Sequence, residues 1–417
     1  MNMKQFLIII LVVFTNLLHA QKNYTPIVFV HGMLGSGDTW VRPMQNFISQ
    51  GYSKDQLEVL DWNSISFNNK AAEQQLDSII DVVLNRTGAH KVNLVGHSAG
   101  GNLCSNYLKE EKNAAKVNNY VHVGSFTLNK APSVPTLNLY STEDKIVKGA
   151  AIEGAKNVAL AELDHYEIAT AIESFKQMYG FFNSSTPLSF KEETKTEHVM
   201  LSGRVVSLGE NKAEKNASLE VYPFDPLTGE RLTKKPVFTT IVNAQGYWGE
   251  FKANANTHYE FIIKPADNTK RVIHYYREPF SNNNHWIYLR TLPQVGMAKM
   301  LLGNLPNDET QVALAVFSAN KAVIHGRDEL TVNGVALSSE VFAAESKTAI
   351  AFFLYDANKN NTTDANAISA FRILPFMSGI DLYFAPNNDP IHLQYNKRNL
   401  RVKPIPSDEG VMVVVFD

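Results

Sequence analysis

The stretch Gly96-His97-Ser98-Ala99-Gly100 has the residue types and the spacing of a serine nucleophile. It follows the short apolar run Val92–Val95 and precedes a helical pattern over Asn102–Glu110, so the serine stands in a sharp turn between a strand and a helix. Glycine two residues to either side leaves room for neighbouring backbone, and the start of a helix favours negative charge. The pattern predicts that Ser98 is a nucleophile projecting above a sheet.

A serine hydroxyl is a weak nucleophile until a base takes its proton, and a third group has to orient that base. Asp144 follows the apolar segment Leu137–Tyr140, and His165 follows Val158–Leu163. In the chain order serine, acid, histidine, all three side chains come to the same edge of a parallel sheet. We therefore predict Ser98, Asp144 and His165 as the catalytic residues. Five titratable residues of the same segment are rivals: Glu143, Asp164, His97, His122 and His31.

Two of these rivals have specific arguments against a catalytic role. His122 lies inside an apolar strand, where a packed core histidine is expected. His97 precedes the nucleophile in the chain, contrary to the required order.

An attacking serine also needs hydrogen-bond donors for the oxyanion that forms on the substrate. The amide of Ala99, the residue after the nucleophile, is one predicted donor. The other is expected from the loop 31–35, His-Gly-Met-Leu-Gly, which follows the apolar run Ile27–Val30. We predict Met33 N–H as this second donor.

The elements that must position these residues alternate between strand and helix from Thr25 to Asn183. The apolar runs have no polar face, as in buried parallel strands, and Ala71–Arg86 and Tyr166–Tyr179 have apolar residues at helical spacing. This alternation predicts an α/β domain with a mostly parallel sheet covered on both faces. The expected strands are Ile27–Val30, Leu57–Leu60, Val92–Val95, Tyr120–Val123, Leu137–Tyr140 and Val158–Leu163.

The pattern changes beyond residue 183. The polar stretch Asn183–Pro187 and the charged run Lys191–Glu197 predict a linker, and the short strands that follow predict an all-β sandwich or barrel. We divide the chain into a signal peptide (1–20), an α/β catalytic domain (21–183), a linker (184–198) and a β-sandwich (199–293). Residues 294–417 form either a second β-rich domain or one half of a larger β domain.

The first twenty residues have the layout of a secretory signal peptide. Lys4 precedes the apolar run Phe6–Phe14, and Ala20 supplies a small residue at the cleavage position. A membrane-spanning helix needs about 20 apolar residues, whereas polar residues interrupt this run from Thr15 onward. We expect cleavage after Ala20 and a secreted or periplasmic mature protein that has no further membrane segment.

The net charge limits which partners are expected, and the cysteine count limits what can stabilise the fold. A formal net charge of −2 provides no broad attraction to nucleic acid or anionic membranes. Cys104 is the single cysteine, so an exported form has no internal disulfide and depends on its cores. This cysteine lies on the apolar face of the helix after Ser98, where core packing is favoured over a reactive thiol. No cofactor is predicted.

Residues 25–182 resemble the small secreted, lid-less lipases of the Bacillus type, within the α/β-hydrolase superfamily. The resemblance implies the α/β-hydrolase fold, with Ser98, Asp144 and His165 as the triad and Met33 and Ala99 as oxyanion donors. In that family the first residue of the turn around the serine is usually alanine, whereas this chain has Gly96 there, as most serine hydrolases have glycine. The stretches that carry the resemblance are Pro26–Gly32, Gln50–Asp55, Thr87–Val92, Gly96–Gly101, Ser141–Val147 and Gly154–Val158.

The β-rich part has two resemblances of its own. In domain layout, the chain is similar to an archaeal lipase whose appended β domain helps to bind lipid substrate. Residues 199–293 resemble the transthyretin-like, carboxypeptidase-regulatory sandwich, which implies a structural or binding element and not a catalyst. This second resemblance is carried by Leu201–Val205, Ala217–Val221 and Asn243–Trp248.

The residues expected around the entrance to the site are apolar, which favours acyl chains over sugars or charged peptides as substrates. Between Gly100 and Asp144 there is no insertion long enough for a sizeable lid, so any cover has to come from the β region. The predicted substrate-binding residues, beside Met33, are Leu34, Phe126, Leu128, Ile146 and Val147.

These observations predict a secreted carboxylic-ester hydrolase, a lipase or esterase acting on acylglycerols, with a lipid or polymer surface as a partner of the β region. Two alternatives stay open: an acyltransferase that uses the same triad, and a surface-binding protein with the hydrolase fold as scaffold. Acyl-chain length, lipid against polyester substrate, and oligomeric state stay open too.

A weaker pattern lies in the C-terminal half. Asp356, Asn358, Asn360 and Asp364 place oxygen-bearing side chains along one loop, and calcium suits such hard ligands. The turn glycine and final glutamate of an EF-hand loop are absent, so a plain polar hairpin loop is the favoured interpretation.

Overall fold

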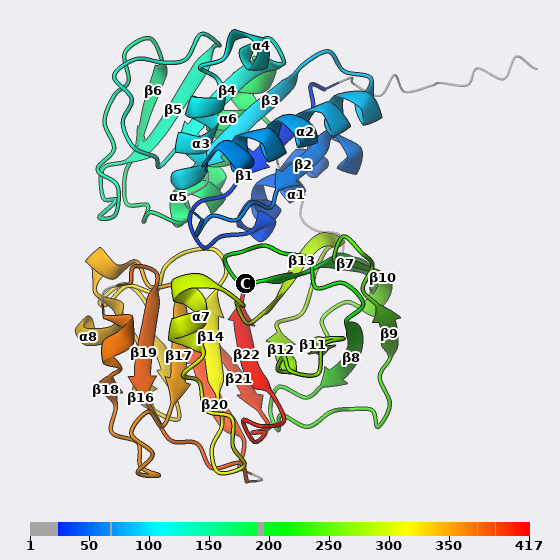
Figure 1. The fold of residues 1–417 in the computed structure, drawn as a ribbon, viewed down its shortest axis with the longest axis vertical. Helices are drawn as coiled ribbons and strands as arrows, with labels where there is room; N and C mark the ends of the chain where they lie inside the picture. The colour runs from blue at the N-terminus through cyan, green and yellow to red at the C-terminus, as the bar shows by residue number, and fades with distance from the viewer. Residues whose placement is uncertain (1–23, 67–68, 190–195, 373, 388) are drawn as a thin grey trace, which may run out of the picture.

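The computed structural model describes residues 24–66, 69–189, 196–372, 374–387 and 389–417. The predicted signal peptide and most of the charged run in the predicted linker lie outside these residues. An N-terminal α/β domain, blue to green in Figure 1, is stacked on a C-terminal β region, green to red.

The N-terminal domain is built on a parallel sheet, which is six-stranded within the described residues and has the order β2-β1-β3-β4-β5-β6. The predicted fold class is thereby confirmed. β6 ends earlier than predicted because it is an edge strand, and its pairing stops where β5 ends, at Ser141 opposite Leu160. The strands are β1 (Ile27–Val30), β2 (Leu57–Leu60), β3 (Val92–His97), β4 (Val117–Val123), β5 (Thr136–Ser141) and β6 (Lys156–Leu160).

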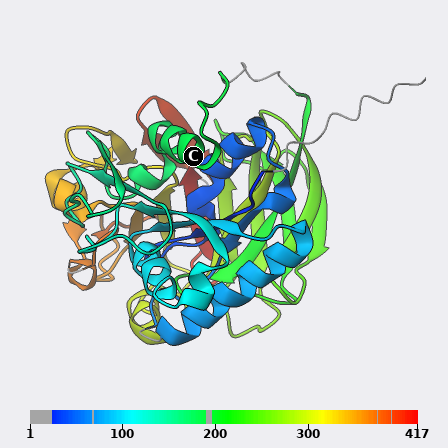
Figure 2. The same cartoon turned by 90° about the horizontal axis from the view of Figure 1, so that it is seen from above.

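Helices cover both faces of this sheet, as Figure 2 shows. Along β1, Val28 and Val30 pack in the core under α2 (Asn69–Thr87) and α3 (Ala99–Tyr107). The alternate residue Phe29 packs in the core under α1 (Val41–Ser49), α5 (Glu167–Thr170) and α6 (Ile172–Asn183). The helix predicted over 166–179 is therefore two helices, because Ala171 between them has an extended backbone. A short helix, α4 (Glu111–Ala114), precedes β4.

The β region contains, within its described residues, a three-stranded sheet of order β10-β7-β13 and a nine-stranded sheet of order β18-β19-β17-β14-β22-β12-β11-β8-β9. Strands from residues 198–293 are β7 (His198–Ser207), β8 (Ser218–Phe224), β9 (Phe238–Ile241), β10 (Tyr247–Asn254), β11 (His258–Lys264), β12 (Ile273–Arg277) and β13 (Asn284–Thr291).

A small four-stranded sheet, β16-β15-β20-β21 among the described residues, completes the β region. The elements beyond residue 293 are α7 (Gly296–Leu302), β14 (Leu314–Ser318), β15 (Leu330–Val332), β16 (Val335–Ala336), α8 (Glu340–Ala343), β17 (Ala351–Tyr355), β18 (Asn366–Ala367), β19 (Met377–Asp381), β20 (Ile391–Tyr395), β21 (Arg398–Val402) and β22 (Val411–Phe416).

β22 connects strands from the two sides of residue 293. It lies between β12 and β14, so one sheet joins the two predicted β segments. Val411, Val413 and Val415 pack in one core, and the alternating residues of β22 pack in a second core on the opposite face of the sheet. The unbroken apolar run of this strand follows from burial on both faces.

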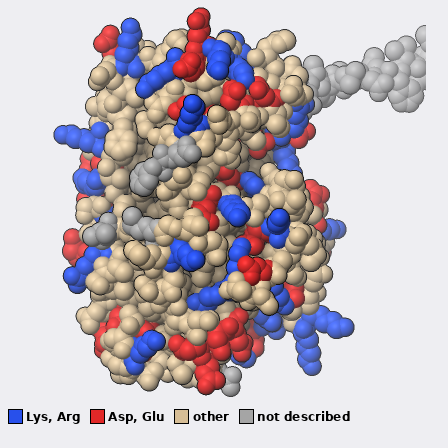
Figure 3. Space-filling view, viewed as in Figure 1, with Lys and Arg blue, Asp and Glu red and all other residues tan. Residues whose placement is uncertain are grey.

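The two domains also share a core. Val206, Trp286 and Tyr288 of the β region belong to the same buried cluster as Trp40 and Val59 of the α/β domain. Charged side chains of both signs are interspersed over the face in Figure 3. No helix among the described residues is long and apolar enough to cross a membrane.

Candidate active site

Ser98 lies in the turn between β3 and α3, with no intervening loop. Its φ of 52° and ψ of −123° form a conformation that residues with a side chain rarely adopt. The turn is tightly packed. A Cβ added at Gly96 would lie 2.7 Å from the carbonyl oxygen of Gly100, and one added at Gly100 would lie 2.4 Å from that of His31. Glycine is required at both positions because backbone occupies the space that a side chain would fill.

His165 links Ser98 to Asp144 through both of its ring nitrogens. Nε2 lies 2.9 Å from Ser98 Oγ, and Nδ1 lies 2.6 Å from Asp144 Oδ2. The three residues follow β3, β5 and β6, whose carboxyl ends meet at one edge of the parallel sheet. All three are buried. The structure thus brings together the three residues that the sequence pattern selects.

Electrostatics decide which nitrogen of His165 carries the proton. Burial opposes ionisation of Asp144, but the hydrogen bond and charge of His165 outweigh it, helped by the amides of Ile146 and Val147 at 2.8 and 2.9 Å. Together they hold the pKa of Asp144 below its usual value. An ionised carboxylate only accepts hydrogen bonds, so Nδ1 donates to Asp144 and Nε2 offers its lone pair to the Ser98 hydroxyl.

Three of the rival residues have other partners. His97 Nε2 donates to the backbone carbonyl of His165 at 2.7 Å, and burial together with the nearby His165 lowers the pKa of His97 to about 3. His97 is therefore a neutral support for His165. Burial lowers the pKa of His122 to about 4, as in the expected core histidine. Glu143 is half-exposed and pairs with Lys145 at 3.3 Å.

The loop after β1 passes close to Ser98. A Cβ added at Gly32 would lie 3.0 Å from Ser98 Cβ, so the loop backbone runs directly beside the serine. Leu34 N–H donates to Ser64 Oγ at 2.9 Å, while the side chain of Met33 is 42% exposed. The loop is therefore close enough to serve Ser98, and the part of Met33 N–H as an oxyanion donor stays a prediction, as does that of the helix amide.

Asn211, in the connection between β7 and β8, is a side chain of the β region that holds this loop. Its Nδ2 lies 2.9 Å from the carbonyl oxygens of Gly35 and Trp62, and 3.2 Å from His31 Nε2. Its Oδ1 accepts from the Ser36 hydroxyl at 2.6 Å. Asn211 is buried, so the loop beside the nucleophile is fixed by a residue from the other domain.

The loop that carries His165 is held by the β region as well. The Asp164 carboxylate accepts from two amides at the start of α5, and from Ala322 N–H and Arg327 Nη2, each at 3.0 Å. The ring of Phe376 stacks on the His165 ring, with centroids 5.7 Å apart and planes 20° apart. Asp164 is therefore committed to holding the loop in place.

Sequence reasoning missed Asn211, Arg327 and Phe376. Asn211 lies in the polar stretch 209–216, and nothing in its neighbours marks a contact with the first domain. Arg327 and Phe376 lie in the strand-rich C-terminal part, far along the chain from Ser98. Only docking of the two domains reveals them.

Comparison with known proteins agrees with this architecture. Residues 25–147 match the sequence model of the family described as the alpha/beta hydrolase fold. The N-terminal domain is an α/β-hydrolase domain. Residues 197–293 match the model of the lipase C-terminal domain, and residues 304–417 match a further C-terminal domain model. The N-terminal part of the chain thus matches the alpha/beta hydrolase fold, and the segment after the linker matches the lipase C-terminal domain.

Several solved structures are similar to this chain over part of its length. A predicted hydrolase from Thermoplasma acidophilum is 16% identical over 39% of this chain and 88% of its own, with a TM-score of 0.32. Lipase B from Aspergillus fumigatus is 14% identical over 40% of this chain and 54% of its own, with a TM-score of 0.33. A mature lipase from Bacillus licheniformis is 14% identical over 38% of this chain and 91% of its own, with a TM-score of 0.31.

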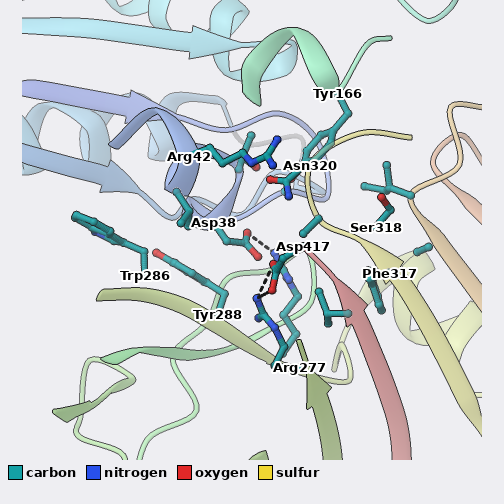
Figure 4. Close-up of a pocket in the computed structure, with 18 of the residues that line it drawn as sticks. Asp38, Arg42, Tyr166, Arg277, Trp286, Tyr288, Phe317, Ser318, Asn320 and Asp417 are labelled. Atoms are coloured by element: carbon teal, nitrogen blue, oxygen red, sulfur yellow. Dashed lines mark hydrogen bonds and ion pairs between the residues drawn. The ribbon is translucent and has the colours of Figure 1, made fainter. Parts of the chain in front are cut away.

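A cavity of about 350 Å³ opens between the hydrolase domain and the β region, and both Met33 and Phe376 line it. Its wall is mixed rather than apolar. Figure 4 shows Asp38 beside the β region, where it pairs with Arg290 at 2.5 Å, and Asp417 paired with Arg277 at 2.7 Å. The cavity therefore has paired charges as well as apolar side chains in its wall, next to the loop that follows β1.

The predicted substrate-binding residues divide into two groups. Leu34 lines the interdomain cavity, as Met33 does. The others lie outside it, because they follow β4 and β5, whereas the cavity lies over the β1 loop and α1 where the β region docks. Val147 is buried, and Phe126 is 61% exposed. The residues outside the cavity are Phe126, Leu128, Ile146 and Val147.

The calcium candidates lie in the loop between β17 and β18. Asn358 and Asn360 donate to Asp364 at 2.6 and 3.0 Å, and Asp356 accepts from backbone amides of the same loop. These bonds close the loop on itself as a polar hairpin. In the described parts of the chain, no group of three or more His, Cys, Asp and Glu residues is placed to hold a metal ion.

Proposed function

We propose that this protein is a serine carboxylic-ester hydrolase of the lipase or esterase class, which cleaves acylglycerols through an acyl-enzyme. The observation that carries the proposal is the hydrogen-bonded chain from Ser98 through His165 to Asp144, at 2.9 and 2.6 Å, in the turn between β3 and α3 of an α/β-hydrolase domain. A nucleophile, a base and an orienting carboxylate stand in the order that acyl transfer needs.

In the first half of the reaction, Ser98 Oγ attacks the ester carbonyl carbon while His165 Nε2 takes the hydroxyl proton. The negative charge that forms on the carbonyl oxygen is stabilised by the amides of Met33 and Ala99. Asp144 stays ionised and stabilises the imidazolium. When the intermediate collapses, His165 gives its proton to the departing alcohol oxygen, and the acyl group remains on Ser98.

In the second half, water takes the place of the alcohol. His165 Nε2 accepts a proton from this water as its oxygen attacks the acyl carbon, and the same amides stabilise the second oxyanion. The bond to Ser98 Oγ breaks, the proton returns to the serine, and a carboxylic acid leaves. His97 supports both halves because its ring holds the backbone carbonyl of His165.

Two features support an ester with an acyl chain as the substrate. Residues 197–293 are similar to the lipase C-terminal domain. The cavity beside Met33 contains apolar side chains, among them Leu34 and Phe317, next to the polar groups that suit a glycerol backbone.

The test is hydrolysis of p-nitrophenyl esters from acetate to palmitate by the wild type and by Ser98→Ala. A matched control is Ser105→Ala, which removes a buried hydroxyl from the same helix α3. We expect Ser98→Ala to lose about 10³-fold or more in kcat, because the covalent step is gone, and Ser105→Ala to stay active. Activity that survives Ser98→Ala would refute the proposal. Activity on long chains indicates a lipase, and activity confined to acetate and butyrate indicates an esterase.

Export is part of the proposal. Lys4, the apolar run after it and Ala20 support a cleaved signal peptide and a secreted or periplasmic enzyme. N-terminal sequencing of protein recovered outside the cytoplasm is expected to begin at Gln21. A sequence beginning at Met1 would contradict cleavage.

A further inference from the structure

The imidazole of His165 has contacts of two kinds: hydrogen bonds in the plane of the ring and an aromatic ring stacked on its face. Hydrogen bonds at Nδ1 and Nε2 fix the ring within its plane, between Asp144 and Ser98. Phe376 of the β region covers the ring face, with centroids 5.7 Å apart and planes 20° apart. His165 is 1% exposed and Phe376 is 8% exposed, so both rings of the stack are buried. In-plane bonds alone permit the ring to tilt, whereas a stacked ring opposes that motion.

Phe376 occupies its position at a conformational cost. Its φ is 70°, in the left-handed region where a bulky residue is an outlier. Three backbone hydrogen bonds hold it there: its N–H donates to Lys347 at 2.9 Å, and its carbonyl accepts from Ile350 at 2.9 Å and Ala351 at 3.0 Å. Glycine would fit this backbone without strain. Strained residues of this kind persist at sites where their side chain has a role.

On these grounds we propose that Phe376 is a positioning residue for His165, which it keeps aimed at Ser98 throughout the reaction. The inference rests on the proposed function, since it concerns the proton that His165 carries between Ser98 Oγ and the leaving oxygen. It also gives the β region a role in the reaction, because the loop that carries Phe376 helps to hold the His165 ring in place.

A substrate contact or a packing residue at position 376 would behave differently from a positioning residue. Phe376 lines the interdomain cavity, as a simple substrate contact does, and loss of a substrate contact affects KM. Phe376 is also buried, as a residue that only fills space is, and loss of such packing affects stability. A positioning residue affects kcat, and it affects the rate at which Ser98 reacts with a small reagent that does not reach the cavity.

The size of the effect follows from the contact. Aromatic pairs contribute about 0.5–1.5 kcal/mol beyond their buried area, which corresponds to about twofold to tenfold in rate. We expect Phe376→Leu and Phe376→Gly to lower kcat toward p-nitrophenyl butyrate by about this factor, with KM within about twofold. Phe376→Tyr keeps the ring and is expected to keep kcat.

The experiment compares these variants with Phe384→Leu in the full-length protein. Phe384 is likewise a buried phenylalanine of the β region, but it does not line the interdomain cavity and has no ring contact with His165 among the described residues. For each variant, kcat, KM, the rate of Ser98 modification by a small alkyl phosphonate ester, and the thermal unfolding midpoint are measured.

The inference is supported if kcat and the phosphonate rate fall together in Phe376→Leu and Phe376→Gly and are retained in Phe376→Tyr and Phe384→Leu. It is overturned if Phe376→Leu keeps the wild-type kcat, or if Phe384→Leu lowers kcat equally. Should Phe376→Gly unfold, the leucine and tyrosine variants decide. Failure of the proposed function is seen separately, as wild-type activity that survives Ser98→Ala.

Discussion

Replacing Asn211 by aspartate tests how far the β region controls the loop beside the nucleophile. Aspartate has the shape of asparagine and tolerates the left-handed backbone at this position, where φ is 54°. The change removes the Nδ2 donors and points an oxygen at the carbonyl oxygens of Gly35 and Trp62, both of which lie 2.9 Å away. The perturbation therefore combines lost hydrogen bonds between the domains with a buried carboxylate that faces two carbonyl oxygens.

The size of the effect follows from those bonds. Each donated hydrogen bond contributes about 1 kcal/mol net, and a buried acceptor left without its donor costs about 1–3 kcal/mol. For two carbonyls, the expected loss is about 2–6 kcal/mol in the free energy of unfolding, most of it felt by the loop 31–36. Loss of one oxyanion donor lowers kcat by about 10²–10³. Since the loop is displaced and not removed, we expect kcat/KM to fall by at least about tenfold.

The assay is kcat/KM for p-nitrophenyl butyrate together with urea unfolding. Asn216→Asp is the matched control: it makes the same chemical change at an exposed residue of the same connection, with φ of 62°. We expect Asn216→Asp to match the wild type in both measurements. Asn211→Asp with wild-type kcat/KM would refute the reasoning, because it would show that the loop keeps its geometry without the Nδ2 hydrogen bonds of Asn211.

Three further predictions concern stability and reactivity. Burial opposes ionisation of Glu260, but His274 and Arg231 outweigh it and lower the pKa of Glu260 from 4.5 to about 2. The ionised carboxylate therefore contributes about 3 kcal/mol to the free energy of unfolding. This contribution is present above pH 4.5 and is lost as the pH falls toward about 2. Glu260→Gln should therefore be less stable than the wild type in thermal unfolding at pH 7, and equal stability there would contradict the ion pairing. Gly100→Ala should lower the unfolding midpoint and activity, since its Cβ would meet two backbone carbonyls at 2.4 and 2.5 Å, and overpacking costs about 1–3 kcal/mol; unchanged activity would show that the turn can relax. Burial raises the pKa of the Cys104 thiol well above its usual value, so a thiol reagent should label the protein only after unfolding, and rapid native labelling would contradict this.

Local patterns were sufficient to predict the α/β domain and the residues of the candidate site. An apolar run followed by Gly-x-Ser-x-Gly has few solutions other than a strand, a sharp turn and a helix, because only glycine permits the close backbone contacts around Ser98. Parallel strands place their carboxyl ends at one edge, so the turns that carry Asp144 and His165 come to the serine without any knowledge of distant contacts.

Strand neighbours in the β region were not predictable in this way. An apolar run such as Val411–Phe416 indicates a strand buried on both faces, but alternation says nothing about which strands flank it. In the structure β22 lies between β12 and β14, which makes one sheet of two segments whose relation the sequence left open.

The other features of the candidate site depend on how the two domains pack against each other. The sequence by itself predicted the candidate nucleophile Ser98, its candidate partners and the sheet that aligns them, because each prediction depends on neighbouring residues and on strand direction. Only the tertiary structure decided that Asn211 holds the loop beside Ser98, that Phe376 covers His165, and that the cavity lies between domains. Those contacts depend on the shape and polarity of two surfaces whose residues are far apart in the chain, and no local spacing encodes how such surfaces meet.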